Sequence, residues 1–85
     1  MTYRVQIQPP ARKQLEKLDH QVRERVGRAI DALADNPRPQ GCKHLVGRPA
    51  YRIRVGDWRV IYEVHDGLLL VLVLELGHRR EIYDR

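Results

Sequence analysis

Two alternating runs of apolar and basic residues occupy positions 51–62 and are joined by Gly56-Asp57. A period of two interrupted by a Gly-Asp pair predicts a β-hairpin with a two-residue turn. In that register Arg54 lies opposite Arg59, and Arg52 lies opposite Ile61. The apolar side chains of the hairpin then share one face, and the three arginines share the other, which we call the arginine face.

Arg54 and Arg59 repel each other in this arrangement. Like charges directly opposite destabilise a sheet by a few tenths to about 1 kcal/mol. A face that carries such a pair is suited to binding an anion, and phosphate is the leading candidate.

The chain before the hairpin predicts one strand and two helices. Residues 3–8 alternate in polarity, which predicts a strand with one buried face, and Pro9-Pro10 ends it. A short helix is expected from about Pro10 to Leu18, and Asp19 can cap a second one that ends at Asn36-Pro37. The second helix has an apolar stripe made of Val22, Val26, Ala29, Ile30 and Leu33. We expect both helices to pack on the apolar face of the sheet.

After the hairpin, Asp66-Gly67 predicts a second two-residue turn, and residues 68–76 are apolar except for Glu75. Such a run predicts a central strand buried on both faces, which Gly77 ends. In this register Arg59 lies opposite Leu74, while Leu76 and His78 fall on the arginine face. The expected fold is α+β: a strand, a helical hairpin and a three-stranded antiparallel meander, forming one domain over residues 1–85.

The composition favours a nucleic-acid or acidic protein partner. Sixteen Lys and Arg residues against eleven Asp and Glu residues give a net charge of +5. On the long loop between the second helix and the hairpin, Lys43 and Arg48 can extend the positive surface. The single cysteine and the lack of a signal peptide or membrane-length apolar run predict a soluble cytoplasmic protein. No metal-ligand spacing is visible, so neither a metal nor another cofactor is expected.

Three segments, in this order of elements, resemble the RelE branch of the RelE/ParE toxin superfamily. They are Tyr51-Arg52-Ile53-Arg54, Trp58-Arg59-Val60-Ile61-Tyr62 and Gly77-His78-Arg79-Arg80-Glu81-Ile82-Tyr83. The resemblance implies the toxin of a type II toxin-antitoxin pair, which enters the ribosomal A site and cuts mRNA. It also implies a cognate antitoxin as partner, operator DNA bound only through that antitoxin, and no membrane association.

The resemblance also carries over to single residues. Arg52 and Arg54 stand where the best-known members have lysines, and Arg59 matches their hairpin arginine. Arg79 matches a later arginine, and Tyr83 matches a C-terminal tyrosine. Because a guanidinium is a poor proton acceptor near neutral pH, the change from lysine to arginine puts such a role in doubt.

Metal-independent RNA cleavage proceeds by attack of a 2'-hydroxyl on the adjacent phosphate. The predicted catalytic residues are Arg54, Arg59, His78, Arg79 and Tyr83. The arginines would stabilise charge, His78 or an arginine would move protons, and Tyr83 would stack on a base or orient the hydroxyl. Glu63 and Glu81 could act as bases, but ion pairs with the arginines are the preferred interpretation. The predicted RNA-binding residues are Lys43, Arg48, Arg52 and Arg80.

Two other functions stay open on the sequence. A non-enzymatic, ParE-like inhibitor of DNA gyrase is compatible with the same superfamily fold. A degenerate toxin homologue that only binds nucleic acid is the other. The group formed by His78, Arg79 and Tyr83 favours RNA cleavage over both.

Overall fold

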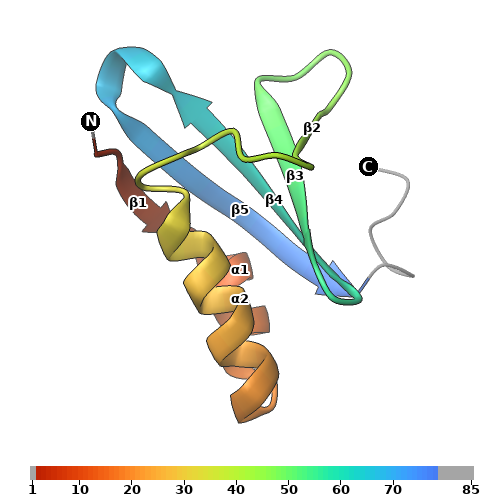
Figure 1. Ribbon diagram of the computed structural model, residues 1–85. Helices are drawn as coiled ribbons and strands as arrows, with labels where there is room; N and C mark the ends of the chain where they lie inside the picture. The colour runs from red at the N-terminus through yellow and green to blue at the C-terminus, as the bar shows by residue number, and fades with distance from the viewer. Residues whose placement is uncertain (1, 79–85) are drawn as a thin grey trace.

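Five strands form one open sheet, and both helices pack on a single face of it (Figure 1). The computed structural model describes residues 2–78. In chain order the elements are β1 (Arg4–Ile7), α1 (Pro9–Glu16), α2 (His20–Ala32), β2 (Lys43–His44), β3 (Ala50–Val55), β4 (Trp58–His65), a 3₁₀ turn (Asp66–Leu68) and β5 (Leu70–His78).

The strand order is β1-β5-β4-β3-β2, so β5 lies between the first strand and the hairpin. The pairing of β1 with β5 is parallel, whereas the pairings of β2 with β3, β3 with β4 and β4 with β5 are antiparallel. The predicted α+β architecture is confirmed. Within residues 2–78, neither helix is long and apolar enough to cross a membrane.

Local sequence explains both helices. Two prolines fill the first turn of α1, where their missing N–H groups cost nothing. At the start of α2 the Asp19 carboxylate accepts a 3.0 Å hydrogen bond from the Val22 N–H, as the sequence predicts. The helices and the sheet share a core whose largest members are Val26, Ile30, Leu33, Val60, Tyr62, Val71 and Val73. We call the sheet surface beneath them the helix face.

The β3–β4 hairpin has the predicted register. Arg54 pairs with Arg59, and Arg52 pairs with Ile61. Gly56 takes a positive φ of 62° in the turn, a conformation that glycine adopts without steric cost. The three arginines therefore do share a face.

The β4–β5 connection differs from the prediction. The chain makes a 3₁₀ turn and then a left-handed residue, Leu69, so that His65 pairs with Leu70. Further along, Tyr62 pairs with Val73 but Ile61 pairs with Glu75, which leaves Leu74 as an extra residue in β5. This is a β-bulge, and one extra residue moves the following side chains to opposite faces.

Three expectations for β5 are therefore wrong. Arg59 lies opposite Gly77 and not Leu74. The strand continues through Gly77 to His78. Leu76 is buried in the core of the helix face, and neither it nor His78 lies on the arginine face. The longer β4–β5 connection and the bulge at Leu74 together explain the changed partner of Arg59 and the change of face. The predicted strand end had a different basis, because glycine weakens a strand interior, and Gly77 nevertheless stays within β5.

The loop between α2 and β2 is held by long-range hydrogen bonds. The buried Tyr62 hydroxyl donates to the Pro37 carbonyl at 2.7 Å, and burial raises the pKa of that hydroxyl, so it stays protonated. Arg38 makes two bonds to the Asp66 carboxylate, at 2.8 and 3.1 Å, and one of 3.0 Å to the Tyr51 hydroxyl. The loop thereby delivers β2 to the edge of β3.

Candidate functional site

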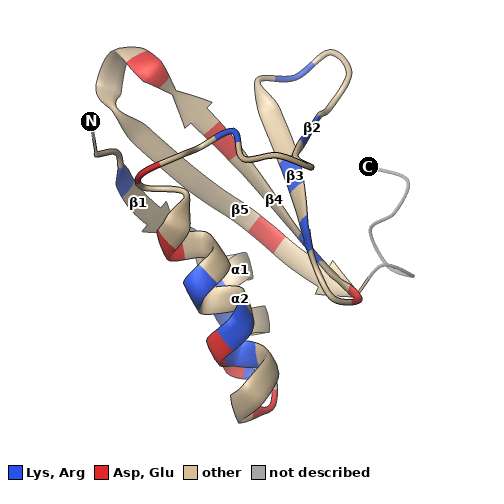
Figure 2. Ribbon diagram, viewed as in Figure 1, with Lys and Arg blue, Asp and Glu red and all other residues tan. Residues whose placement is uncertain are grey.

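The strand pairings arrange the arginine face in two rows. Lys43, Arg52, Ile61 and Glu75 follow one another across β2, β3, β4 and β5. Arg54, Arg59 and Gly77 form the next row toward the hairpin turn. Figure 2 shows basic positions along β3 and an acidic position within β5, which is Glu75. Within these two rows the β2–β4 side is cationic, and the β5 side carries the carboxylate of Glu75.

Arg54 and Arg59 differ in their surroundings although they face each other. Arg54 is exposed, whereas Arg59 is 8% exposed and is the one buried charged residue among those described. Packing restricts a buried side chain, so Arg59 has less conformational freedom to lose on binding a ligand than Arg54 has. Arg54 extends into solvent and can adjust to a ligand.

A small cavity lies at the hairpin tip beside this pair. It has a volume of about 80 Å³ and is lined by Arg54, Gly56, Asp57 and Arg59. Two guanidinium groups outweigh one carboxylate here, so the cavity favours a small anionic group. A planar guanidinium can bind two phosphate oxygens at once.

The predicted RNA-binding residues lie near this pair only in part. Lys43 pairs with Arg52 on the arginine face, as expected for an extended positive surface. Arg48 lies in the exposed β2–β3 loop. Arg79, Arg80 and Tyr83, together with Glu81, fall outside the described residues.

His78 lies on the helix face, so its predicted place beside Arg54 and Arg59 is wrong. It pairs with Trp58 across β4 and β5, and the two rings meet edge to face with centroids 5.6 Å apart. Trp58 packs against the main core. The bulge at Leu74 is the physical reason for the change of face.

The carboxylates also differ from expectation. Glu63 was expected to pair with an arginine, but its Oε1 lies 2.8 Å from Nε2 of His65. Glu75, which the sequence reasoning did not consider for the site, lies half-buried on the arginine face. The available signal was that Glu75 alone interrupts the apolar run of residues 68–76. Among the described residues, no three His, Cys, Asp or Glu side chains form a group that could hold a metal ion.

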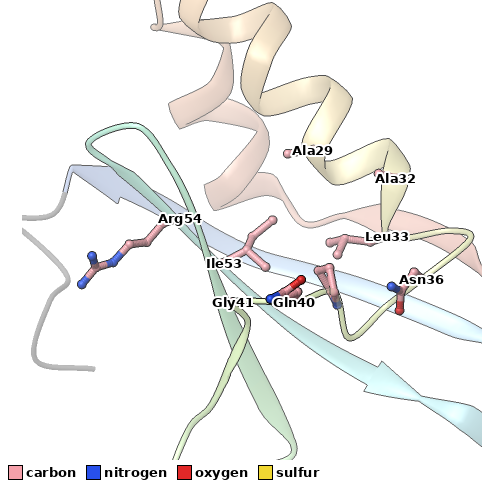
Figure 3. A pocket seen from close by; sticks show the side chains of 9 residues that line it. Ala29, Ala32, Leu33, Asn36, Gln40, Gly41, Ile53 and Arg54 are labelled. Atoms are coloured by element: carbon pink, nitrogen blue, oxygen red, sulfur yellow. The ribbon is translucent and has the colours of Figure 1, made fainter.

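A larger cleft lies on the opposite side of β3, between this strand and α2 (Figure 3). Its volume is about 530 Å³, and Ala29, Leu33 and Ile53 contribute to a mainly apolar lining. Figure 3 shows the Arg54 side chain pointing away from the other lining residues. The cleft is therefore chemically distinct from the arginine face and does not suit a phosphate.

Known proteins resemble the chain over nearly its whole length. The family described as "ParE toxin of type II toxin-antitoxin system, parDE" matches residues 5–83. A RelE-like toxin protein of Escherichia coli is 28% identical over 88 residues, which cover 99% of this chain and 93% of that protein.

Solved structures share the fold. The RelE-RelB complex of Pyrococcus horikoshii matches with a TM-score of 0.85 and 33% identity, covering 95% of this chain and 99% of that one. A mutant of the E. coli toxin RelE in the free state matches with a TM-score of 0.82 and 25% identity, covering 98% and 90%.

Proposed function

The chain belongs to the ParE toxin family of type II toxin-antitoxin systems, and from this we propose that it is a ribosome-dependent endoribonuclease. It would cut mRNA in the ribosomal A site and thereby stop translation. The observation that carries the proposal is the facing pair of Arg54 and Arg59, one exposed and one buried, beside a small cavity. Such a pair suits a phosphate whose negative charge increases during the reaction.

In the proposed reaction the 2'-hydroxyl of one nucleotide attacks the adjacent phosphorus. The O2'–P bond forms, the P–O5' bond breaks, and the products are a cyclic phosphate and a 5'-hydroxyl. Arg59, restricted by burial, would bind the non-bridging oxygens, and Arg54 would close on them from solvent. Preorganised donors of this kind are each worth about 10²–10³ in rate.

Other residues would hold the RNA on either side of the scissile phosphate. Lys43 and Arg52 continue the positive surface toward β2 and are proposed to contact the backbone. Arg48 on the β2–β3 loop, and Arg80, are proposed as further backbone contacts. Arg79 and Tyr83 remain predicted members of the active site.

An antitoxin is the expected protein partner. The P. horikoshii RelE was solved in complex with RelB, and membership of a toxin-antitoxin family implies a comparable partner here. We infer that this antitoxin contains an acidic segment that folds onto the toxin, because the chain carries a net charge of +5. Operator DNA would be bound only through the antitoxin.

Cell-free translation tests the proposal. Wild type should stop protein synthesis and leave cut message, while Arg59→Ala should lose at least about 10²-fold in cleavage rate. Arg12→Ala, an exposed arginine on α1, is the matched control and should behave as wild type. Inhibition without cut message, or equal inhibition by Arg59→Ala, would contradict the proposal.

Inhibition of DNA gyrase is the second candidate, since the matching family is named for ParE. A supercoiling assay separates the two functions. Loss of supercoiling by wild type, with intact mRNA in the translation assay, would favour gyrase. If induction of the toxin leaves cell growth unchanged, the chain is a degenerate homologue that only binds nucleic acid.

A further inference from the structure

The bulge in β5 determines the face on which Glu75 lies. Val73 pairs with Tyr62 and faces the core; with uninterrupted alternation, Glu75 would face the core as well. The extra residue, Leu74, instead brings Glu75 opposite Ile61, whose side chain lies on the arginine face. Bulges often re-aim a side chain next to an active site.

Glu75 lies at the boundary between charged and apolar surroundings. On the arginine face, Leu74 and Ile61 pack with Leu45 and Ala50 in a small apolar cluster. Arg59 is in the adjacent row on the neighbouring strand, and same-face neighbours at such a diagonal are about 7–8 Å apart, with somewhat less between their Cβ atoms. A carboxylate is thus placed beside the most buried guanidinium of the described chain.

Within residues 2–78, the charged groups on the neighbouring strands that share the face of Glu75 come from β4, β3 and β2. Arg59 and Glu63 lie on β4, and Glu63 is bonded to His65. Arg52 occupies the same row on β3, with Lys43 beyond it on β2. On the other side of β5, pairing with β1 ends at Val73, before Glu75 is reached. These neighbouring groups are mainly cationic.

The proposed cleavage needs a group that can accept the 2'-hydroxyl proton. Arginine is unsuited because its guanidinium stays protonated throughout the physiological range. His78 lies on the helix face, against Trp58. A carboxylate on the arginine face is a group of the chemical type that can accept a proton.

We propose that Glu75 is a catalytic residue that accepts this proton. The inference rests on the proposed function. As the O2'–P bond forms, the hydroxyl proton moves to a Glu75 carboxylate oxygen, Arg59 and Arg54 hold the phosphate, and the P–O5' bond breaks. The departing 5'-oxygen takes a proton from water, and Glu75 returns its own proton to solvent before the next cycle.

Single-turnover cleavage on ribosomes, measured between pH 5 and 8, is the test. Glu75→Gln preserves size and polarity but cannot accept the proton; we expect the rate at saturation to fall by about 10²–10⁴-fold. The decline of the wild-type rate toward acid pH should be absent in this variant. The apparent KM should change by no more than about twofold, since phosphate binding stays with the arginines.

Two further variants separate catalysis from a structural role. Glu75→Asp keeps a carboxylate and should recover part of the rate. Glu63→Gln changes a second carboxylate of the arginine face, which lies on β4. The Glu63 side chain is bonded to His65, so this variant should cleave as wild type. Thermal unfolding of every variant confirms that the fold is kept.

Two results overturn the inference while leaving the proposed function intact. One is a wild-type rate for Glu75→Gln. The other is a slower Glu75→Gln that has a raised KM and keeps the acid decline, which would indicate an ion pair that orders the arginines. If wild type itself leaves the message uncut, the proposed function and this inference fail together.

Discussion

Arg59 lies directly opposite Gly77 in the pairing of β4 with β5. Glycine has no side chain, so nothing projects from β5 onto the arginine face at this point of the row. Arg59 is 8% exposed although its partner contributes no side chain to cover it. In the row of Arg54, Arg59 and Gly77, no side chain from β5 competes with Arg59 for space.

Replacing Gly77 with alanine should impair cleavage by crowding Arg59. Gly77 is not among the glycines with positive φ, so alanine fits its backbone. The added Cβ would point onto the arginine face beside Arg59, and displacement of a catalytic group by about 1 Å can cost 10²-fold. Because Gly77 is buried, the added methyl group should also lower stability, by about 1–3 kcal/mol. Cleavage rates and urea unfolding measure the two effects.

Gly27→Ala is the matched control for that substitution. Gly27 lies within α2, and a Cβ there meets no atom within 4 Å. The change should raise stability by about 1 kcal/mol and leave cleavage unaltered. Wild-type cleavage by Gly77→Ala would show that Arg59 does not need the space.

Arg54→Thr should stabilise the protein while slowing cleavage. Removal of one of two facing like charges is expected to gain a few tenths to about 1 kcal/mol, and the gain should shrink as salt screens the repulsion. Urea unfolding at low and high salt tests this. Arg4→Thr, on β1 opposite Leu70, should show no comparable salt-dependent gain. An unchanged or lowered stability of Arg54→Thr would mean that the pair is not repulsive.

His78→Phe should keep the aromatic contact with Trp58. Because His78 lies on the helix face, this variant should keep the wild-type cleavage rate and its pH profile. His78→Ala loses that contact, and we expect a stability loss of about 0.5–1.5 kcal/mol. Thermal unfolding and cleavage between pH 5 and 8 distinguish the variants. If both stably folded variants lose cleavage equally, His78 takes part in proton transfer as the sequence suggested.

Asp66→Asn should lower the melting temperature at neutral pH. Hydrogen bonds from Arg38 and then Tyr3 lower the pKa of Asp66 from 3.8 to about 2. A pKa lowered by folding stabilises the native state above the unfolded value, and this contribution disappears as pH falls through the folded value. The difference between variant and wild type should thus be full above pH 4 and shrink toward pH 2. Asp35→Asn is the control, because Asp35 is exposed and lies just after α2. Its melting temperature relative to wild type should not depend on pH in this way.

Most of the fold could be predicted because its signals are local. The Gly56-Asp57 turn fixes the hairpin register, and Asp19 marks the start of α2. The β5 register could not be derived in this way. It depends on a left-handed Leu69 and on a bulge at Leu74. Residues 68–74 are all apolar, so hydrophobic periodicity cannot show where the turn ends or where the extra residue lies.

The candidate site was predicted in part for the same reason. Arg52, Arg54 and Arg59 follow from the hairpin alone, whereas the positions of Glu75, Gly77 and His78 depend on the bulge. Arg38 and Asp66 are bonded although they are 28 positions apart in the sequence, and no local sequence pattern predicts such a contact.

The place of β5 in the sheet affects the order in which the protein becomes complete during synthesis. β1, both helices and the hairpin are translated before Leu70–His78, yet β5 is the neighbour to which both β1 and β4 must pair. A nascent chain that lacks this strand has Arg54 and Arg59 but neither Glu75 nor Gly77. The last strand to emerge is therefore the one that completes the arginine face, so the sheet can close only when nearly the whole described chain has been made.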